Sequence, residues 1–341
     1  MGKLSFLDIP RVVSPFPGDI LREMQSEISK VMMNHVPELR SNEGSLDPQA
    51  HIDSATETIS SFVFGIMSNI YKLGLEKVKK EAETILEYLL GNFNNTCYRE
   101  ILKFPDQVAY VKKVLISMTK TTQGIVFLLA FNELEKHENS ASHCFRVALL
   151  VAEIGEKMKW TPEQKEIGVL SALGHDIMKS LIPSNILSKR EDLNNGERAI
   201  MDLHSFFSAY FFQTISKVIK DYKLEKKEGV VFDVIKIIAG NHHPSRYLTT
   251  DKHKDRISFE SELKEAKNFL PIVILADVFV ALTEEGRGYK KPFSAQEVFE
   301  VLSKEEKAGY ISKDSLEAFF STQSGIDFYQ QYLEEAKLES I

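Results

Sequence analysis

The stretch Leu173-Gly174-His175-Asp176-Ile177-Met178-Lys179 decides how the second half of this chain folds and where its chemistry lies. It follows a segment that opens with Thr161-Pro162-Glu163-Gln164. There a capping hydroxyl, a proline at the first helical position and a glutamine that closes the capping box predict a helix start. We expect this helix to end near His175. Because neighbouring side chains on a helix diverge by about 100°, His175 and Asp176 could then serve two neighbouring metal ions, or one ion plus a bridge.

The rest of the chain has a helical pattern as well. Apolar residues recur at three- and four-residue spacing, and alternating runs bounded by hairpin turns are missing from the sequence. This pattern predicts an all-α protein. We predict helices over 55–73, 75–90, 106–136 and 295–304, with a break at Gly91-Asn92-Phe93-Asn94-Asn95.

Two domains are expected from the length of 341 residues, of which 43% are hydrophobic. Residues 1–125 would form a smaller helical N-terminal domain, and residues 126–341 a helical bundle domain. The first has no cluster of chemically useful residues, which favours a sensor, docking or homodimerisation role.

Composition excludes several classes of function. A net charge of −7 argues against binding to a nucleic acid polymer or an anionic membrane. The apolar runs are too short for a membrane span, and no signal sequence opens the chain, so we expect a cytoplasmic protein. Cys97 and Cys144 are the only cysteines, which predicts neither a disulfide framework nor a structural zinc site.

Histidines and aspartates are the candidate metal ligands. Imidazole and carboxylate together suit borderline divalent ions such as iron, manganese, cobalt or zinc. The alternative without metal binding is a set of buried histidines that only form hydrogen bonds. Four of the nine histidines, His35, His51, His137 and His253, lack partners in the pattern and are predicted to lie at the surface. The candidate ligands are His143, His175, Asp176, His204, His242, His243 and Asp277.

The order of these residues, from His143 to Lys290, resembles that of the HD-GYP family of cyclic-dinucleotide phosphodiesterases. The pieces that carry the resemblance are His143-Cys144-Phe145-Arg146-Val147, Leu173 to Lys179, Ile182-Pro183, Ile186 to Lys189, Glu197, His204, Asn241-His242-His243, Ala276-Asp277-Val278 and Arg287-Gly288-Tyr289-Lys290.

The resemblance implies an HD-type helical bundle that holds two divalent metal ions, with iron or manganese the first choices. One ion would be held by His143, His175, Asp176 and Asp277, and the other by Asp176, His204, His242 and His243. A hydroxide between the ions would attack the phosphorus of a cyclic dinucleotide, such as cyclic di-GMP, or of a related small phosphoester. Asp176 and Lys179 would be catalytic, and Lys179, Arg287 and Lys290 would bind the phosphates of the substrate.

The sequence also departs from the family. No Gly-Tyr-Pro tripeptide precedes Asp277, and Asn139 replaces the glutamate of three-metal members, which favours two ions. Met178 replaces a glycine and is expected to narrow the mouth of the site. Val280 replaces an acid and removes a partner for a metal ligand. Two alternatives stay open: a signalling module that binds metal and nucleotide with little turnover, and a single-ion nucleotide phosphohydrolase of the wider HD group.

Overall fold

The structure is a computed structural model that describes residues 48–136, 140–189, 191–222, 229–243, 266–284 and 292–339. Every regular element in these ranges is a helix, which confirms the all-α prediction. The elements of the first half are α2 (Pro48–Leu73), α3 (Leu75–Thr96), α4 (Tyr98–Lys103), α5 (Pro105–Met118), α6 (Thr122–Glu135) and α7 (Ser140–Lys157). They are followed by α8 (Pro162–Gly174), the 3-10 helix η2 (Ile177–Leu181), α9 (Ser184–Leu187), α10 (Asn195–Tyr222), α11 (Gly229–Asn241), α14 (Leu270–Thr283), α15 (Ala295–Lys307), α16 (Lys313–Phe320) and α17 (Gln323–Glu339).

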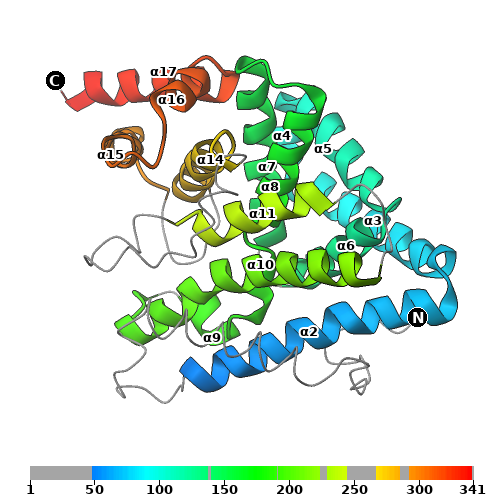
Figure 1. The fold of residues 1–341 in the computed structure, drawn as a ribbon. Helices are drawn as coiled ribbons and strands as arrows, with labels where there is room; N and C mark the ends of the chain where they lie inside the picture. The colour runs from blue at the N-terminus through cyan, green and yellow to red at the C-terminus, as the bar shows by residue number, and fades with distance from the viewer. Residues whose placement is uncertain are drawn as a thin grey trace.

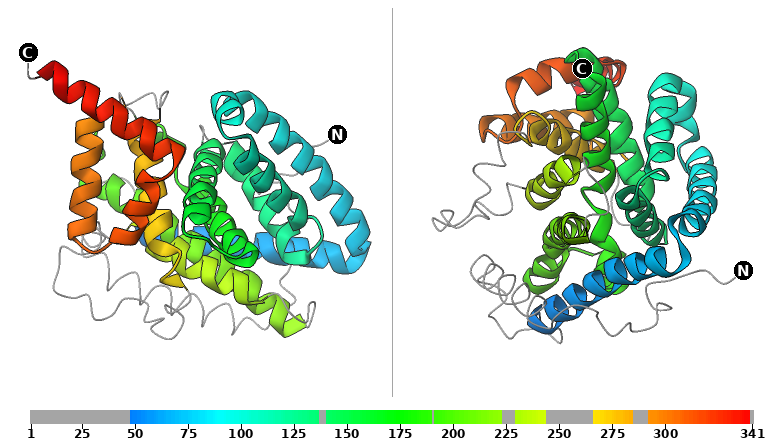
Figure 2. Two further views of the ribbon diagram at one scale, coloured as in Figure 1. Left: turned by 90° about the horizontal axis from the view of Figure 1, so that it is seen from above. Right: turned by 45° about the vertical axis from the view of Figure 1, so that its right-hand side comes forward.

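Helices α7 and α8 form the centre of the molecule and pack against each other (Figure 1). Helix α14 packs on α7, while α10 and α11 pack together and contact η2 and α8, respectively. In Figure 2, helices α3, α5 and α6 stand beside α7 on the side away from α14 to α17. Helix α14 also contacts α8 and α11.

The N-terminal helices share a core with the rest of the chain. Helix α2 lies along α10 (Figure 1), where Ser60 and Tyr210 join their hydroxyl groups at 3.0 Å. The ring of Phe93 in α3 stacks on Phe145 in α7 with the centroids 4.2 Å apart, and both residues are fully buried. Apolar burial of this kind contributes most of the stabilisation of a helical fold.

Two helix predictions in this region are wrong. Helix α3 runs through Gly91-Asn92-Phe93-Asn94-Asn95 to Thr96, because burial of Phe93 outweighs the weak helix propensity of this segment. The predicted helix 106–136 is two helices, α5 and α6, bent by 115° at their junction. Thr121 caps α6 by accepting from the backbone N–H of Gly124. Only glycine fits at position 124, because a Cβ atom there would lie 2.2 Å from the carbonyl oxygen of Met118.

The prediction for α8 is confirmed. The hydroxyl of Thr161 accepts from the N–H of Gln164, whose side chain accepts from the N–H of Thr161 in return. The helix ends at Gly174, and His175 is its C-terminal cap. The same reciprocal cap, formed by Ser294 and Glu297, begins α15.

Gly174 sits between two buried phenylalanine rings directly before His175. A Cβ atom there would lie 2.7 Å from Phe212 and 3.2 Å from Phe127, so Gly174→Ala must displace a ring or the backbone. We expect this overpacking to lower the free energy of unfolding by about 1–3 kcal/mol in denaturant titration. In contrast, Gly91→Ala, at a helical position with nothing within 4 Å, should raise it by about 1 kcal/mol. Equal effects of the two changes would contradict the steric argument.

None of the described helices is by itself long and apolar enough to span a membrane, although the bent pair α5 and α6 reaches that length and apolarity together. Both cysteines are buried and free.

Candidate metal centre

The seven predicted ligands converge from five segments of the chain. All are buried except His243, whose side chain is 15% exposed. His143 lies on α7, His175 caps α8, Asp176 precedes η2, His204 lies on α10, His242 and His243 follow α11, and Asp277 lies on α14.

Three of the histidines are held in one orientation by the backbone. The Nδ1 atom of His175 donates to the carbonyl of Ala172 at 2.7 Å, and that of His242 donates to Ala239 at 2.8 Å. His204 makes the same contact with the carbonyl three residues before it. A neutral imidazole that donates from Nδ1 carries its lone pair on Nε2. When they are neutral, these three rings therefore present the lone pairs of their Nε2 atoms to the interior of the cluster.

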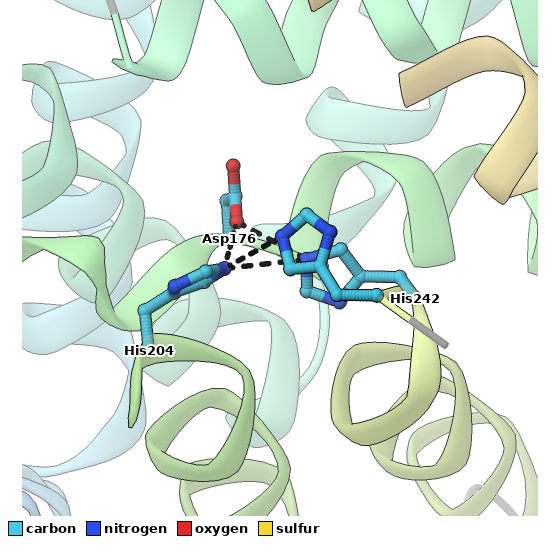
Figure 3. Close-up of side chains that lie close together, drawn as sticks. Asp176, His204 and His242 are labelled. Carbon is cyan, nitrogen blue, oxygen red and sulfur yellow. Dashed lines mark hydrogen bonds and ion pairs between the residues drawn. The ribbon is translucent and has the colours of Figure 1, made fainter. Parts of the chain in front are cut away.

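Asp176 lies between the two halves of the cluster. Its Oδ1 atom is 3.0 Å from Nε2 of His204 and 3.4 Å from Nε2 of His242, and Figure 3 shows both rings pointing toward the carboxylate. Its Oδ2 atom is 3.2 Å from Nε2 of His175 and also accepts from Lys179. Each oxygen thus faces a different group of ligands.

The second half of the cluster is centred on Asp277. Its Oδ1 atom is 2.9 Å from Nε2 of His143 and 3.6 Å from Nε2 of His175. The ligand atoms of these three residues all lie within 4.8 Å of one another, as do those of Asp176, His204, His242 and His243. The two groups are the two ligand sets predicted from sequence, with Asp176 adjoining the first.

The donor set fits divalent cations. Nε2 of His204 lies 3.3 Å from Nε2 of His242 and 3.2 Å from Nε2 of His243. Facing lone pairs repel unless a cation or proton lies between them. Nε2 of His175 and Oδ1 of Asp176 are buried and lie within 3.2 Å of an oppositely polar atom, but neither makes a hydrogen bond of acceptable geometry among the described residues. Buried polar atoms are costly to leave unpaired, and metal coordination would satisfy them.

The electrostatics of the cluster favour ionised carboxylates. Burial would raise the pKa of Asp176, but His175, Lys179 and His204 hold it well below the usual value. Burial would likewise raise the pKa of Asp277, and His143 and His175 lower it strongly. Burial alone would lower the pKa of His175, yet Asp176 and Asp277 raise it to about 10. Burial lowers the pKa of His242 to about 4. Both buried carboxylates are therefore ionised, and the charges of Lys179 and the neighbouring histidines stabilise them.

A cavity of about 370 Å³ opens onto the cluster. His143, His204, His243, Asp277 and Lys179 reach its wall, together with apolar side chains such as Leu187, Met201 and Phe293. The volume suits a ligand of small-molecule size.

Two of the three predicted substrate-binding residues, Arg287 and Lys290, lie outside the described residues, and so does Asn139. The expectation for Met178 is wrong: its side chain is fully buried in the core and does not line the cavity. The surface prediction for His51 is also wrong, because its ring packs edge-on against Phe207 and its Nε2 is buried.

Two neighbours of the cluster were missed in the sequence. The Sγ atom of Cys144 lies within 4.8 Å of ligand atoms of His175 and Asp176, and burial raises the pKa of this thiol well above its usual value. The carboxylate of Glu284 lies 3.4 Å from Nδ1 of His143. No motif points to Glu284, but its position seven residues after Asp277 places both acids on one face of a helix.

Comparison with known proteins agrees with this geometry. Residues 140–282 match the HD domain family. The chain is 27% identical over 218 residues to the 3'3'-cGAMP-specific phosphodiesterase 1 of Vibrio cholerae serotype O1. That match covers 63% of this chain and 45% of the relative, so the chain aligns with less than half of that protein. No solved structure matches the chain. Residues 140–282 therefore form a domain of the HD family, and this range contains all seven predicted ligands.

Proposed function

We propose that this protein is a metal-dependent phosphodiesterase of the HD-GYP kind that hydrolyses a cyclic dinucleotide or a related phosphoester with two divalent ions. The Vibrio cholerae relative makes 3'3'-cGAMP the first substrate to test, and cyclic di-GMP the second. Iron and manganese are the first metals to test, because both accept imidazole and carboxylate ligands.

One observation carries the proposal: the two oxygens of Asp176 face separate ligand groups. A carboxylate can bridge two ions, whereas the Nε2 of a histidine can bind one only. A cluster built for a single ion would need only one of these groups. Asp176 is therefore the residue that we assign to both ions.

Two ions bound in such a site lower the pKa of water and offset charge on a phosphoryl group. The residues of this chain supply the rest. Lys179, beside Asp176 at the cavity wall, would turn to a nonbridging phosphate oxygen and neutralise the charge that develops there. The apolar wall at Leu187, Met201 and Phe293 would cover a nucleobase, and the nearby guanidinium of Arg198 would face a second phosphate.

The proposal is tested with protein purified without oxygen and loaded with iron or manganese. It should contain two ions per chain by elemental analysis and release linear dinucleotide from 3'3'-cGAMP or cyclic di-GMP. Lys179→Met should lower kcat about 100-fold, the usual effect of losing one charge-stabilising group, while metal content stays unchanged. Product chromatography and metal analysis of the same samples separate these effects.

Each of the other outcomes would indicate a different function. Tight binding of a cyclic dinucleotide that is recovered unchanged would show a binding module. One ion per chain with activity on mononucleotides would show a single-ion phosphohydrolase. Failure to turn over any member of a broad phosphoester panel would contradict an enzymatic role.

A further inference from the structure

The inference concerns His143, whose ring lies between two acids of the same helix. Its Nε2 is 2.9 Å from Oδ1 of Asp277, and its Nδ1 is 3.4 Å from Oε2 of Glu284. Glu284 caps the C-terminal end of α14, seven residues after Asp277. The same helix therefore presents one carboxylate to each nitrogen of the ring.

Glu284 is as buried as the ligands themselves, with its side chain 4% exposed. A buried carboxylate is stable only if it is paired and hydrogen-bonded. Its second oxygen, Oε1, accepts from Nη1 of Arg146. Arg146 lies on α7, one turn beyond His143. One oxygen of Glu284 thus meets the arginine and the other meets the histidine.

Arg146 is in turn held by the N-terminal helices. Its Nε donates to Oε1 of Glu100 in α4 at 2.6 Å, and its Nη2 donates to the carbonyl of Thr96 at the end of α3 at 2.8 Å. The three nitrogens of the planar guanidinium therefore each donate to a different acceptor, an arrangement that the single ammonium group of a lysine could not reproduce. A continuous chain of contacts runs from α3 and α4 through Arg146 and Glu284 to His143.

We propose that Glu284 and Arg146 are positioning residues that hold the ring of His143 with Nε2 toward the metal centre, anchored on the N-terminal helices. Metal-ligating histidines usually donate their other N–H to a carboxylate or carbonyl, which fixes the tautomer and the ring plane. Glu284 supplies that partner for His143. The role of this contact rests on the metal binding proposed above.

The decisive variant is Glu284→Gln, which keeps the shape of the side chain and removes its charge. Loss of such an outer partner typically weakens metal binding about 10–100-fold. We expect a weakening of that size for one of the two ions, the one that His143 contacts, while the other ion keeps its affinity. Titration with Mn²⁺ gives the two affinities, and the visible spectrum of the Co²⁺-loaded protein reports the change in coordination.

Arg146→Lys is a second, independent variant. It keeps the positive charge and loses the forked geometry, so it should weaken the same ion. The double variant should be no worse than Glu284→Gln alone, because both changes break one chain of contacts.

Glu153→Gln is the matched control. Glu153 is another buried acid, on α7, and it accepts from the backbone N–H of Gln323 and from the hydroxyl of Ser324 in α17. We expect this change to lower thermal stability and to leave both metal affinities unchanged.

Wild-type affinities and Co²⁺ spectrum in both Glu284→Gln and Arg146→Lys would overturn the proposal, and so would a wild-type protein that binds no metal. A wild-type protein that binds two ions without hydrolysing any phosphoester would contradict only the proposed function. The effect of Glu284→Gln on metal affinity would then still decide the role of Glu284.

Discussion

Asp176→Asn is expected to lose metal from both halves of the cluster and to abolish phosphoester hydrolysis. Asp176 is the only ligand whose two oxygens face both groups, and asparagine replaces one of these oxygens with an NH2 group, which cannot coordinate a metal ion. Because bound metal contributes several kcal/mol to transition-state stabilisation, activity should fall by at least about 1000-fold. Elemental analysis and product chromatography measure the two losses.

His204→Ala is the control that distinguishes loss of a bridging ligand from loss of a ligand to one ion. Among the ligand groups, His204 belongs only to the one that contains His242 and His243. Its removal should empty mainly that half, so that Asp176→Asn loses more metal than His204→Ala. Circular dichroism should show intact helices for Asp176→Asn, because the change is nearly isosteric. Full metal content and activity in Asp176→Asn would disprove the bridging role of Asp176.

Metal affinity should rise steeply with pH. In the metal-free cluster, the carboxylates of Asp176 and Asp277 raise the pKa of His175 to about 10, so His175 is protonated at neutral pH. A metal ion must displace that proton, which changes affinity about tenfold per pH unit, or about 1000-fold between pH 6 and pH 9. His242, with a pKa lowered to about 4, is already neutral in this range and adds no dependence.

The stability of the metal-free protein should follow the opposite trend. A raised pKa in the folded state means that protonated His175 stabilises the fold fully below its unfolded value of 6.5. That contribution is lost as pH rises toward about 10. Thermal unfolding of chelator-treated protein and Mn²⁺ competition titrations across this range would measure the two trends. Calorimetry in two buffers would count the released proton, and a count of zero would contradict this assignment.

The clustering of the seven candidate ligands could be predicted from sequence because the chemistry that singles them out belongs to each residue type. The order of the histidines and aspartates along the chain can be read without coordinates. In the structure, all seven candidates lie in two adjoining clusters. The start of α8 was equally visible, since the cap at Thr161 depends on residues only three apart.

The features that sequence reasoning missed depend on tertiary contacts. Nothing near Phe93 in the sequence shows that its ring will stack on Phe145, and that contact carries α3 through a glycine and three asparagines. Val280 was expected to cost a metal ligand its partner. The structure places a carboxylate one helical turn later, at Glu284, where only the packing of α14 on α7 reveals its contact with His143.

The aromatic seam between the N-terminal helices and the HD domain bears on how the protein can be divided. Phe145 is covered by Phe93, Phe211 by Phe62, and Phe212 by Phe127. Each covering ring lies outside the matched range 140–282. A fragment trimmed to that range would expose Phe145, Phe211 and Phe212 to water. The exposed rings would form an apolar face of the kind that drives self-association. The range matched by the family model is therefore shorter than the unit that folds. We expect the smallest fragment that stays monomeric to include α2 and the helices that follow it.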